Sequence, residues 1–181
     1  MSRLDRFDAA TGAAVDATED AALIAERLSA IGAGFERWPT RTLPPHADDA
    51  AVLHAYADEI AALARSGYPT ADVLRVSPRT PDPDALRARF LSEHTHAEDE
   101  VRFFVEGAAL FTLNAGGIVH SLRAEAGDLV GIPAGMRHWF DMGAAPRFTV
   151  LRMFQNPEGW VARYTGDPIA ERFPRFEPLP A

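Results

Sequence analysis

Four residues of the kinds that bind transition metals lie close together in this sequence. His94, His96 and Glu100 fall within seven positions, and His138 follows a run rich in glycine and proline. Side chains spaced by even numbers on a strand share one face, so the first three converge if residues 93–106 are extended. Three imidazoles and a carboxylate suit a divalent first-row metal of octahedral habit, such as iron or nickel. Two coordination positions would stay open for substrate, which indicates catalysis.

The composition excludes several other kinds of chemistry. The chain has no cysteine, so disulfide bonds, thiolate ligands and cysteine nucleophiles are ruled out. All 18 basic residues are arginine, which removes lysine Schiff bases and the lysine of a phosphate-binding loop. The net charge of −8 offers no basic surface to nucleic acid or to an anionic membrane. We therefore expect a small-molecule substrate, with no nucleic-acid or membrane partner.

The chain is expected to be a cytoplasmic monomer. Its first residues mix acids with bases and lack the apolar core of a signal peptide. No apolar run approaches the ~20 residues that a membrane helix needs. The 181 residues, 47% of them hydrophobic, suffice for one domain spanning 1–181 with a sizeable core.

The ligands must be positioned by the surrounding elements, and residues 1–70 are predicted to form a helical part that packs on a barrel. Asp16 and Glu19 are a plausible cap pair for a first amphipathic helix. A second helix is predicted to run without interruption from Asp48 to near Gly67, because its apolar residues recur every three or four positions.

From residue 71 to about 165, short apolar runs alternate with turn residues, the pattern of a sandwich or barrel, and a C-terminal tail follows. Glycine and proline fall between the runs, where special backbone angles are needed. A short helix is predicted at 84–90. The predicted strands are 72–76, 93–106, 109–113, 118–122, 128–132, 137–141, 149–154 and 161–164.

Four further residues are candidates for binding substrate or for catalysis. Continuing the alternation along the ligand strand turns Arg102 inward, where a buried guanidinium is costly unless an anion pairs with it. Arg152 shares a face with three apolar residues, which predicts a second inward arginine that needs a partner. Phe140 follows the last histidine by two positions and is a candidate pocket wall. Asp99 is either a surface or loop charge or a base beside the ligands.

The ligand spacing resembles the two motifs of the cupin superfamily. Gly107 follows the HxHxxxE run at the expected interval, and Gly127 opens the segment that contains the last histidine. Two positions depart from the pattern, since Ala88 stands where the first motif has a glycine and Met142 where the second has an asparagine.

A closer resemblance is to the acireductone dioxygenase family. It rests on the runs EHTHAEDEVRFFVEG, GDLVGIPAGMRHWFDMG, RFTVLRMF and GWVARYTG, together with IGAGFERW and GYPTADV upstream. The resemblance implies a mainly β cupin fold, a double-stranded β-helix or jelly-roll barrel with flanking helices. It also implies one iron(II) or nickel(II) ion per chain, bound by the two histidines and the glutamate of the first run and by the histidine of the second.

The activity implied by this resemblance belongs to methionine salvage. The substrate would be the ene-diol 1,2-dihydroxy-3-keto-5-methylthiopentene, which the enzyme cleaves with O2. The iron form would yield 2-keto-4-methylthiobutyrate and formate, and the nickel form 3-methylthiopropionate, formate and carbon monoxide. Arg102 and Arg152 would hold the ene-diolate.

Two other classes of function compete with this interpretation. A cupin sugar-phosphate isomerase would need a basic cluster for phosphate, and the arginines of this chain are scattered. A ligand-binding sensor would bring a helix-turn-helix or a degenerate metal motif, and the sequence shows neither. Oxygen consumption with an ene-diol distinguishes the dioxygenase from both.

Overall fold

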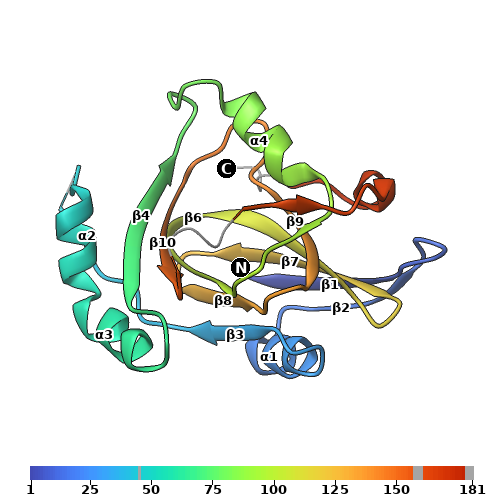
Figure 1. Cartoon of the computed structure of the whole chain (residues 1–181), viewed down its shortest axis with the longest axis horizontal. Helices are drawn as coiled ribbons and strands as arrows, with labels where there is room; N and C mark the ends of the chain where they lie inside the picture. Colours follow the sequence, from blue (N-terminus) through green and yellow to red (C-terminus); the bar gives the residue numbers. More distant parts are fainter. Residues whose placement is uncertain (45, 157–160, 178–181) are drawn as a thin grey trace.

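The computed structural model describes residues 1–44, 46–156 and 161–177, so the part of the predicted barrel at 157–160 lies outside the described residues. Two antiparallel layers curl around a common interior (Figure 1). The first layer has the order β11 (Arg163–Tyr164), β5 (His94–Thr95), β9 (Arg137–Asp141), β6 (Glu100–Ala115), β7 (Ile118–Glu125), β1 (Arg3–Asp8) and β2 (Ala14–Thr18). The second is β4 (Thr70–Val76), β10 (Phe148–Phe154), β6 again, β8 (Asp128–Ile132) and β3 (Gly34–Arg37).

The long strand β6 belongs to both layers. Its first half pairs with β8 and β10, and its second half pairs with β7 and β9. The change of partners occurs at Gly107, which has a φ of +80° and packs so closely that a Cβ would lie 2.1 Å from the carbonyl oxygen of Arg147. The predicted boundary between strands 93–106 and 109–113 is therefore wrong, because the glycine lets one strand bend between layers without ending.

The first 70 residues contain strands as well as helices. β1 pairs with β7, and β3 pairs with β8, so both strands extend the layers that carry the site. The prediction of a purely helical N-terminal part is wrong in this respect. These strands are short, and their pairing with residues more than 90 positions away leaves little trace in local periodicity.

The predicted helices also differ in their limits. α1 (Ala21–Ser29) is capped by the side chain of Asp20, whereas Asp16, from the predicted cap pair, lies in β2. The predicted second helix is two helices, α2 (Asp49–Ala55) and α3 (Ala57–Arg65). Between them stands Tyr56, fully buried, whose hydroxyl accepts a hydrogen bond from the Arg41 amide at 3.0 Å. The predicted helix at 84–90 is α4 (Pro83–Leu91).

Three apolar clusters hold the layers together. The main core fills the space between the layers and includes Phe104, Phe111 and Phe140. A second cluster lies outside the β4–β10–β6–β8 layer, where α2 and α3 cover it (Figure 1). A third joins β7 and β9 to the 3-10 helix Pro168–Arg172 of the C-terminal tail. Among the described helices, none is long and apolar enough to cross a membrane.

Candidate metal centre

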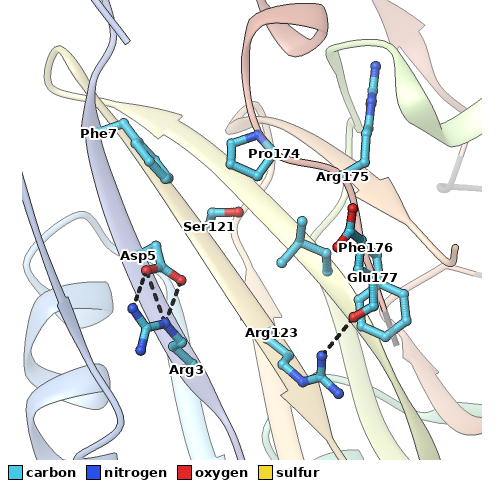
Figure 2. Close-up of a pocket in the computed structure, with 10 residues that line it drawn as sticks. Arg3, Asp5, Phe7, Ser121, Arg123, Pro174, Arg175, Phe176 and Glu177 are labelled. Carbon is cyan, nitrogen blue, oxygen red and sulfur yellow. Dashed lines mark hydrogen bonds and ion pairs between the residues drawn. The ribbon is translucent and has the colours of Figure 1, made fainter. Parts of the chain in front are cut away.

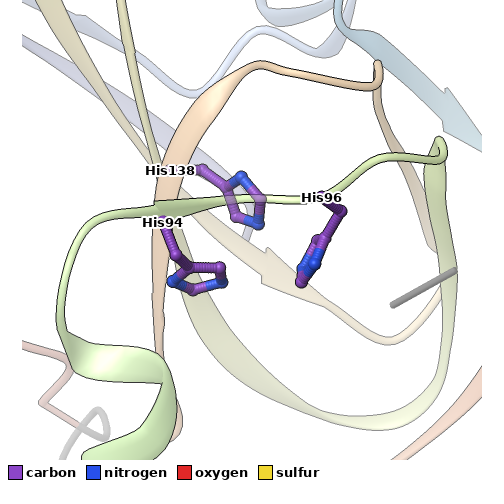
Figure 3. Close-up of side chains that lie close together, drawn as sticks. All are labelled: His94, His96 and His138. Atoms are coloured by element: carbon purple, nitrogen blue, oxygen red, sulfur yellow. The ribbon is translucent and has the colours of Figure 1, made fainter. Parts of the chain in front are cut away.

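Three buried histidines meet at one point between the layers. His94 lies on β5 and His138 on β9, where the two are directly paired across the strands, and His96 follows β5. One nitrogen from each ring lies within 4.8 Å of the corresponding nitrogens of the other two. Figure 3 shows the three rings turned toward one another. This spacing suits three ligands of one metal ion.

The convergence does not come from strand alternation, contrary to the expectation for residues 93–106. β5 ends at Thr95, and residues 96–99 are not in a strand before β6 begins at Glu100. The turn at residues 96–99 brings His96 to the site. The carbonyl of His96 accepts a hydrogen bond at 2.9 Å from the amide of Gly135, which lies just before β9. Alternation holds only from Glu100 onward.

Glu100 adjoins the histidines as an ionised carboxylate. Its Oε2 lies 3.0 Å from His96 Nε2 and 3.5 Å from His138 Nε2, and its Oε1 lies 2.6 Å from Arg102 Nε. Complete burial acts to raise the pKa of this carboxyl, but the adjacent Arg102 guanidinium holds the pKa well below its usual range. The group therefore places a negatively charged oxygen beside two of the imidazoles, those of His96 and His138.

Backbone carbonyls fix the orientation of two of the imidazoles. His94 Nδ1 lies 2.7 Å from the Ser92 carbonyl and His138 Nδ1 lies 2.9 Å from the Met136 carbonyl. A carbonyl only accepts, so each Nδ1 carries the proton and each Nε2 keeps its lone pair. Burial, followed by the neighbouring His138, lowers the pKa of His94 to about 4. His138 Nε2 is buried and has no hydrogen-bond partner among the described residues, which fits a donor atom that a cation would satisfy.

Arg102 and Arg152 lie side by side on the inner face of β6 and β10, as cross-strand partners. Arg102 is only 4% exposed, and its guanidinium lies 4.8 Å from the Phe140 ring centroid. Burial lowers the pKa of Arg102, Glu100 opposes this, and Arg152 adds to the lowering. Arg152 has the partner that its inward direction requires, because its Nε donates to Asp72 Oδ1 at 2.8 Å.

Phe140 and Asp99 lie in different surroundings. Phe140 is buried between Arg102 and the ring of Phe111, whose centroid is 4.7 Å away, so it forms a wall behind the buried guanidinium. Asp99 accepts hydrogen bonds from the Tyr68 hydroxyl at 2.8 Å and from the Ala134 amide at 2.9 Å. Burial and Asp99 raise the pKa of Tyr68 to about 12. Asp99 thus joins the two ligand-bearing segments to the start of β4.

The sequence interpretation missed two aromatic residues that flank His94. The ring of Phe90, on α4, lies 6.4 Å from the His94 ring and 6.4 Å from the Phe140 ring. The Tyr164 ring lies 6.0 Å from the His94 ring. Phe90 lies four positions before His94 in the sequence. A phenylalanine at this position could equally be a core residue, so the sequence alone does not identify it as a wall of the site.

A separate cavity of about 580 Å³ lies on the outer side of β1 and β7 (Figure 2). Its lining includes Arg3, Phe7, Arg123 and Pro174, and none of the residues proposed as ligands. The C-terminal tail forms one side of it, and Arg123 donates to the Glu177 carbonyl there at 3.0 Å. The cavity therefore has no part in the metal centre.

The two-layered β fold and a buried group of three imidazoles beside a carboxylate define a metal-binding cupin, as the sequence predicted. A model of the ARD/ARD' family matches residues 17–162, and the chain belongs to this family.

Several known proteins are similar to this chain over most of its length. The acireductone dioxygenase of Synechococcus sp. (strain CC9605) is 54% identical over 98% of this chain and 100% of its own length. That of Marinobacter nauticus is 54% identical over 86% of this chain and 85% of its own. Among solved structures, acireductone dioxygenase from Bacillus anthracis with a cadmium ion in its active center superposes with a TM-score of 0.81. It is 31% identical, over 91% of this chain and 98% of that one.

Proposed function

We propose that this chain is a metal-dependent dioxygenase that cleaves the acireductone 1,2-dihydroxy-3-keto-5-methylthiopentene with O2. The observation that carries the proposal is the buried donor set of three imidazoles with an adjacent ionised carboxylate, and an arginine against that carboxylate. Membership of the ARD/ARD' family and the names of the relatives support it. The cadmium ion in the active center of the Bacillus anthracis protein supports one divalent metal ion per chain.

Four residues would hold the ion, namely His94, His96, Glu100 and His138. Iron(II) or nickel(II) bound there would supply a Lewis acid and a template for adjacent oxygens of the substrate. The protein prepares the site in advance, because carbonyls of Ser92 and Met136 fix two of the imidazoles in the ligand tautomer.

Arg102 and Arg152 would pair with the anionic ene-diolate. They lie side by side on the inner face of β6 and β10, with Glu100 and Asp72 as flanking anions. Phe140 keeps the Arg102 guanidinium in place from behind and keeps water away. Orienting the substrate in a dry pocket in this way lowers the cost of bringing the reacting atoms together.

For Asp99 we propose a structural role in holding the turn that carries His96, in place of a role as a catalytic base. Both carboxylate oxygens accept hydrogen bonds, from Tyr68 and Ala134, and these bonds tie the carboxylate to neighbouring segments of the chain. Removing this carboxylate would loosen the turn that carries His96 and so weaken the site indirectly.

The wider setting follows from the same proposal. We infer a cytoplasmic, monomeric, single-domain enzyme of methionine salvage, whose partners are the ene-diol and O2, with no nucleic-acid or membrane partner. The products would depend on the metal, with 2-keto-4-methylthiobutyrate and formate from the iron form. The nickel form would release carbon monoxide with 3-methylthiopropionate and formate.

One batch of apoprotein, refilled separately with iron(II) and nickel(II), tests the function. We expect O2 uptake with both metals, keto acid from the iron form and headspace carbon monoxide from the nickel form. Apoprotein without added metal serves as the control for spontaneous oxidation of the substrate. A His138→Ala variant should bind metal weakly and should consume O2 no faster than this control. Identical products with both metals would contradict metal-controlled cleavage, and no metal-dependent uptake would contradict the dioxygenase.

A further inference from the structure

Helix α4 is attached to the barrel by a few polar contacts and by the half-buried side chains of Leu86 and Phe90. None of its nine residues is buried. Arg87 donates to both carboxylate oxygens of Asp141, from Nε at 2.7 Å and from an Nη at 3.0 Å. The last turn is held by the C-terminal segment, since the Arg89 carbonyl accepts from the Tyr164 hydroxyl at 2.8 Å. A helix attached in this way depends on the geometry of a few side chains.

The acceptor for Arg87 is itself fixed. Asp141 is 1% exposed at the end of β9, and its carboxylate also accepts from the amides of Gly143 and Phe176 at 2.8 and 2.9 Å. Burial acts to raise the pKa of Asp141, but Arg87 and the two amides outweigh it and hold the pKa below its ordinary value. The carboxylate is therefore ionised and immobile, and it fixes where Arg87 can lie.

α4 brings an apolar ring to the metal centre. It spans the gap between β4 and β9 at one end of the barrel (Figure 1). Phe90 lies one helical turn beyond Arg87 and contacts the rings of His94 and Phe140. Leu86, beside Arg87, packs on the main core. The ion pair and the wall of the site are thus carried by the same short helix.

We propose that Arg87 is a positioning residue, whose ion pair with Asp141 fixes α4 so that Phe90 closes the apolar side of the metal site. The enzyme would then favour ene-diols that carry an apolar chain over those that do not. This inference rests on the proposed function, because it assigns part of the substrate selectivity of that same site.

The test compares Arg87→Met with Arg87→Lys and with a matched control, Arg41→Met. Arg41 makes an ion pair with Glu59 of α3, a helix that lies apart from α4 (Figure 1). For each protein we would measure amide exchange of residues 83–91, metal affinity by chelator competition, and the unfolding midpoint. Steady-state O2 uptake would be measured with the methylthio ene-diol and with an analogue that has a methyl group in place of the chain.

In Arg87→Met we expect amide exchange of α4 to rise about tenfold, and KM for the methylthio substrate to rise about tenfold. We expect kcat, metal affinity and KM for the short analogue to stay within about twofold. In Arg87→Lys, the amide exchange of α4 and KM for the methylthio substrate should rise less than in Arg87→Met. In Arg41→Met, neither quantity should rise. The unfolding midpoint should fall in Arg87→Met, because Asp141 keeps its two amide donors but loses its counter-ion.

Three results would overturn the inference. Unchanged exchange of α4 would show that the ion pair does not hold the helix. An equal rise of KM for both substrates, or weakened metal binding, would show a general loss of structure. If the wild-type protein consumes no O2 with either ene-diol, the proposed function fails and selectivity fails with it, while the exchange data still decide whether Arg87 holds α4.

Discussion

At the level of single residues, the buried pair of Glu100 and Arg102 determines the electrostatics of the site. The two groups are 2% and 4% exposed, and the distance between Oε1 and Nε is 2.6 Å. Each charge makes the burial of the other tolerable, and neither is tolerable alone. Arg102 therefore neutralises Glu100, and in the proposed function it would also pair with the anionic substrate.

Replacing Arg102 by Met tests this double role. We expect the fold to persist and kcat/KM for the ene-diol to fall by the equivalent of about 2–5 kcal/mol, because a buried charge-assisted contact is lost. Metal affinity should also fall, by roughly tenfold, since Glu100 loses the partner that holds its carboxylate in place. Arg152→Met is the control, because Arg152 pairs with Asp72, so its loss should weaken turnover and leave metal affinity unchanged. Unchanged kcat/KM in Arg102→Met would restrict that residue to a structural role.

At the level of elements, the bend of β6 connects the two halves of the site. The first half carries Glu100 and Arg102, and the second half pairs with β9, which carries His138. Gly107 allows the bend through its positive φ and through close contact with the chain at Arg147. Any side chain at this position forces the two layers apart.

Gly107→Ala should therefore be strongly destabilising. We expect the free energy of unfolding to fall by more than about 3 kcal/mol, because backbone strain and a steric clash with main-chain atoms add together. Gly117→Ala is a matched control, with a φ of +77° and no atom near the added Cβ. It should cost about 1–2 kcal/mol from backbone strain alone. Urea unfolding of both variants measures the difference, and equal losses would mean that the contact at Gly107 is not tight.

At the level of the whole molecule, the N-terminal strands close the barrel interior over a buried histidine. His120 on β7 is 3% exposed and is paired across the strands with Arg6 of β1. Burial first, and then the charge of Arg6, lower the pKa of His120 to about 4, while Asp16 acts in the opposite direction. Folding therefore keeps this imidazole neutral.

This burial makes stability depend on pH. An unfolded histidine titrates near 6.5, so the contribution of His120 is fully present above that pH and is lost as the pH falls from 6.5 toward 4. At pH 5 the loss should be about 2 kcal/mol. His120→Gln should lack this part of the pH dependence. The measurement is the unfolding free energy of apoprotein at pH 7.5 and pH 5, compared between wild type and variant so that the other histidines cancel. An identical pH dependence in both proteins would contradict the prediction.

Local spacing along the sequence determined the fold class and the position of the site. The HxHxxxE run and the later histidine predicted the cluster, and the predicted strands at 128–132 and 137–141 coincide with β8 and β9. These features are encoded within a few residues of one another, as the period of a strand or as a turn that needs glycine or proline. Such signals need no knowledge of distant parts of the chain.

Only the tertiary structure decided which charges meet and which elements close the site. Asp72 lies 80 positions from Arg152, Asp141 lies 54 from Arg87, and Leu4 pairs with Leu122, which lies 118 positions away. Even the meeting of His96 with Glu100 comes from a turn held by Gly135, and not from the strand that the sequence predicted. The physical reason is that register, packing direction and ion-pair partners are set when distant strands align, and the free energy of that alignment belongs to the folded chain as a whole.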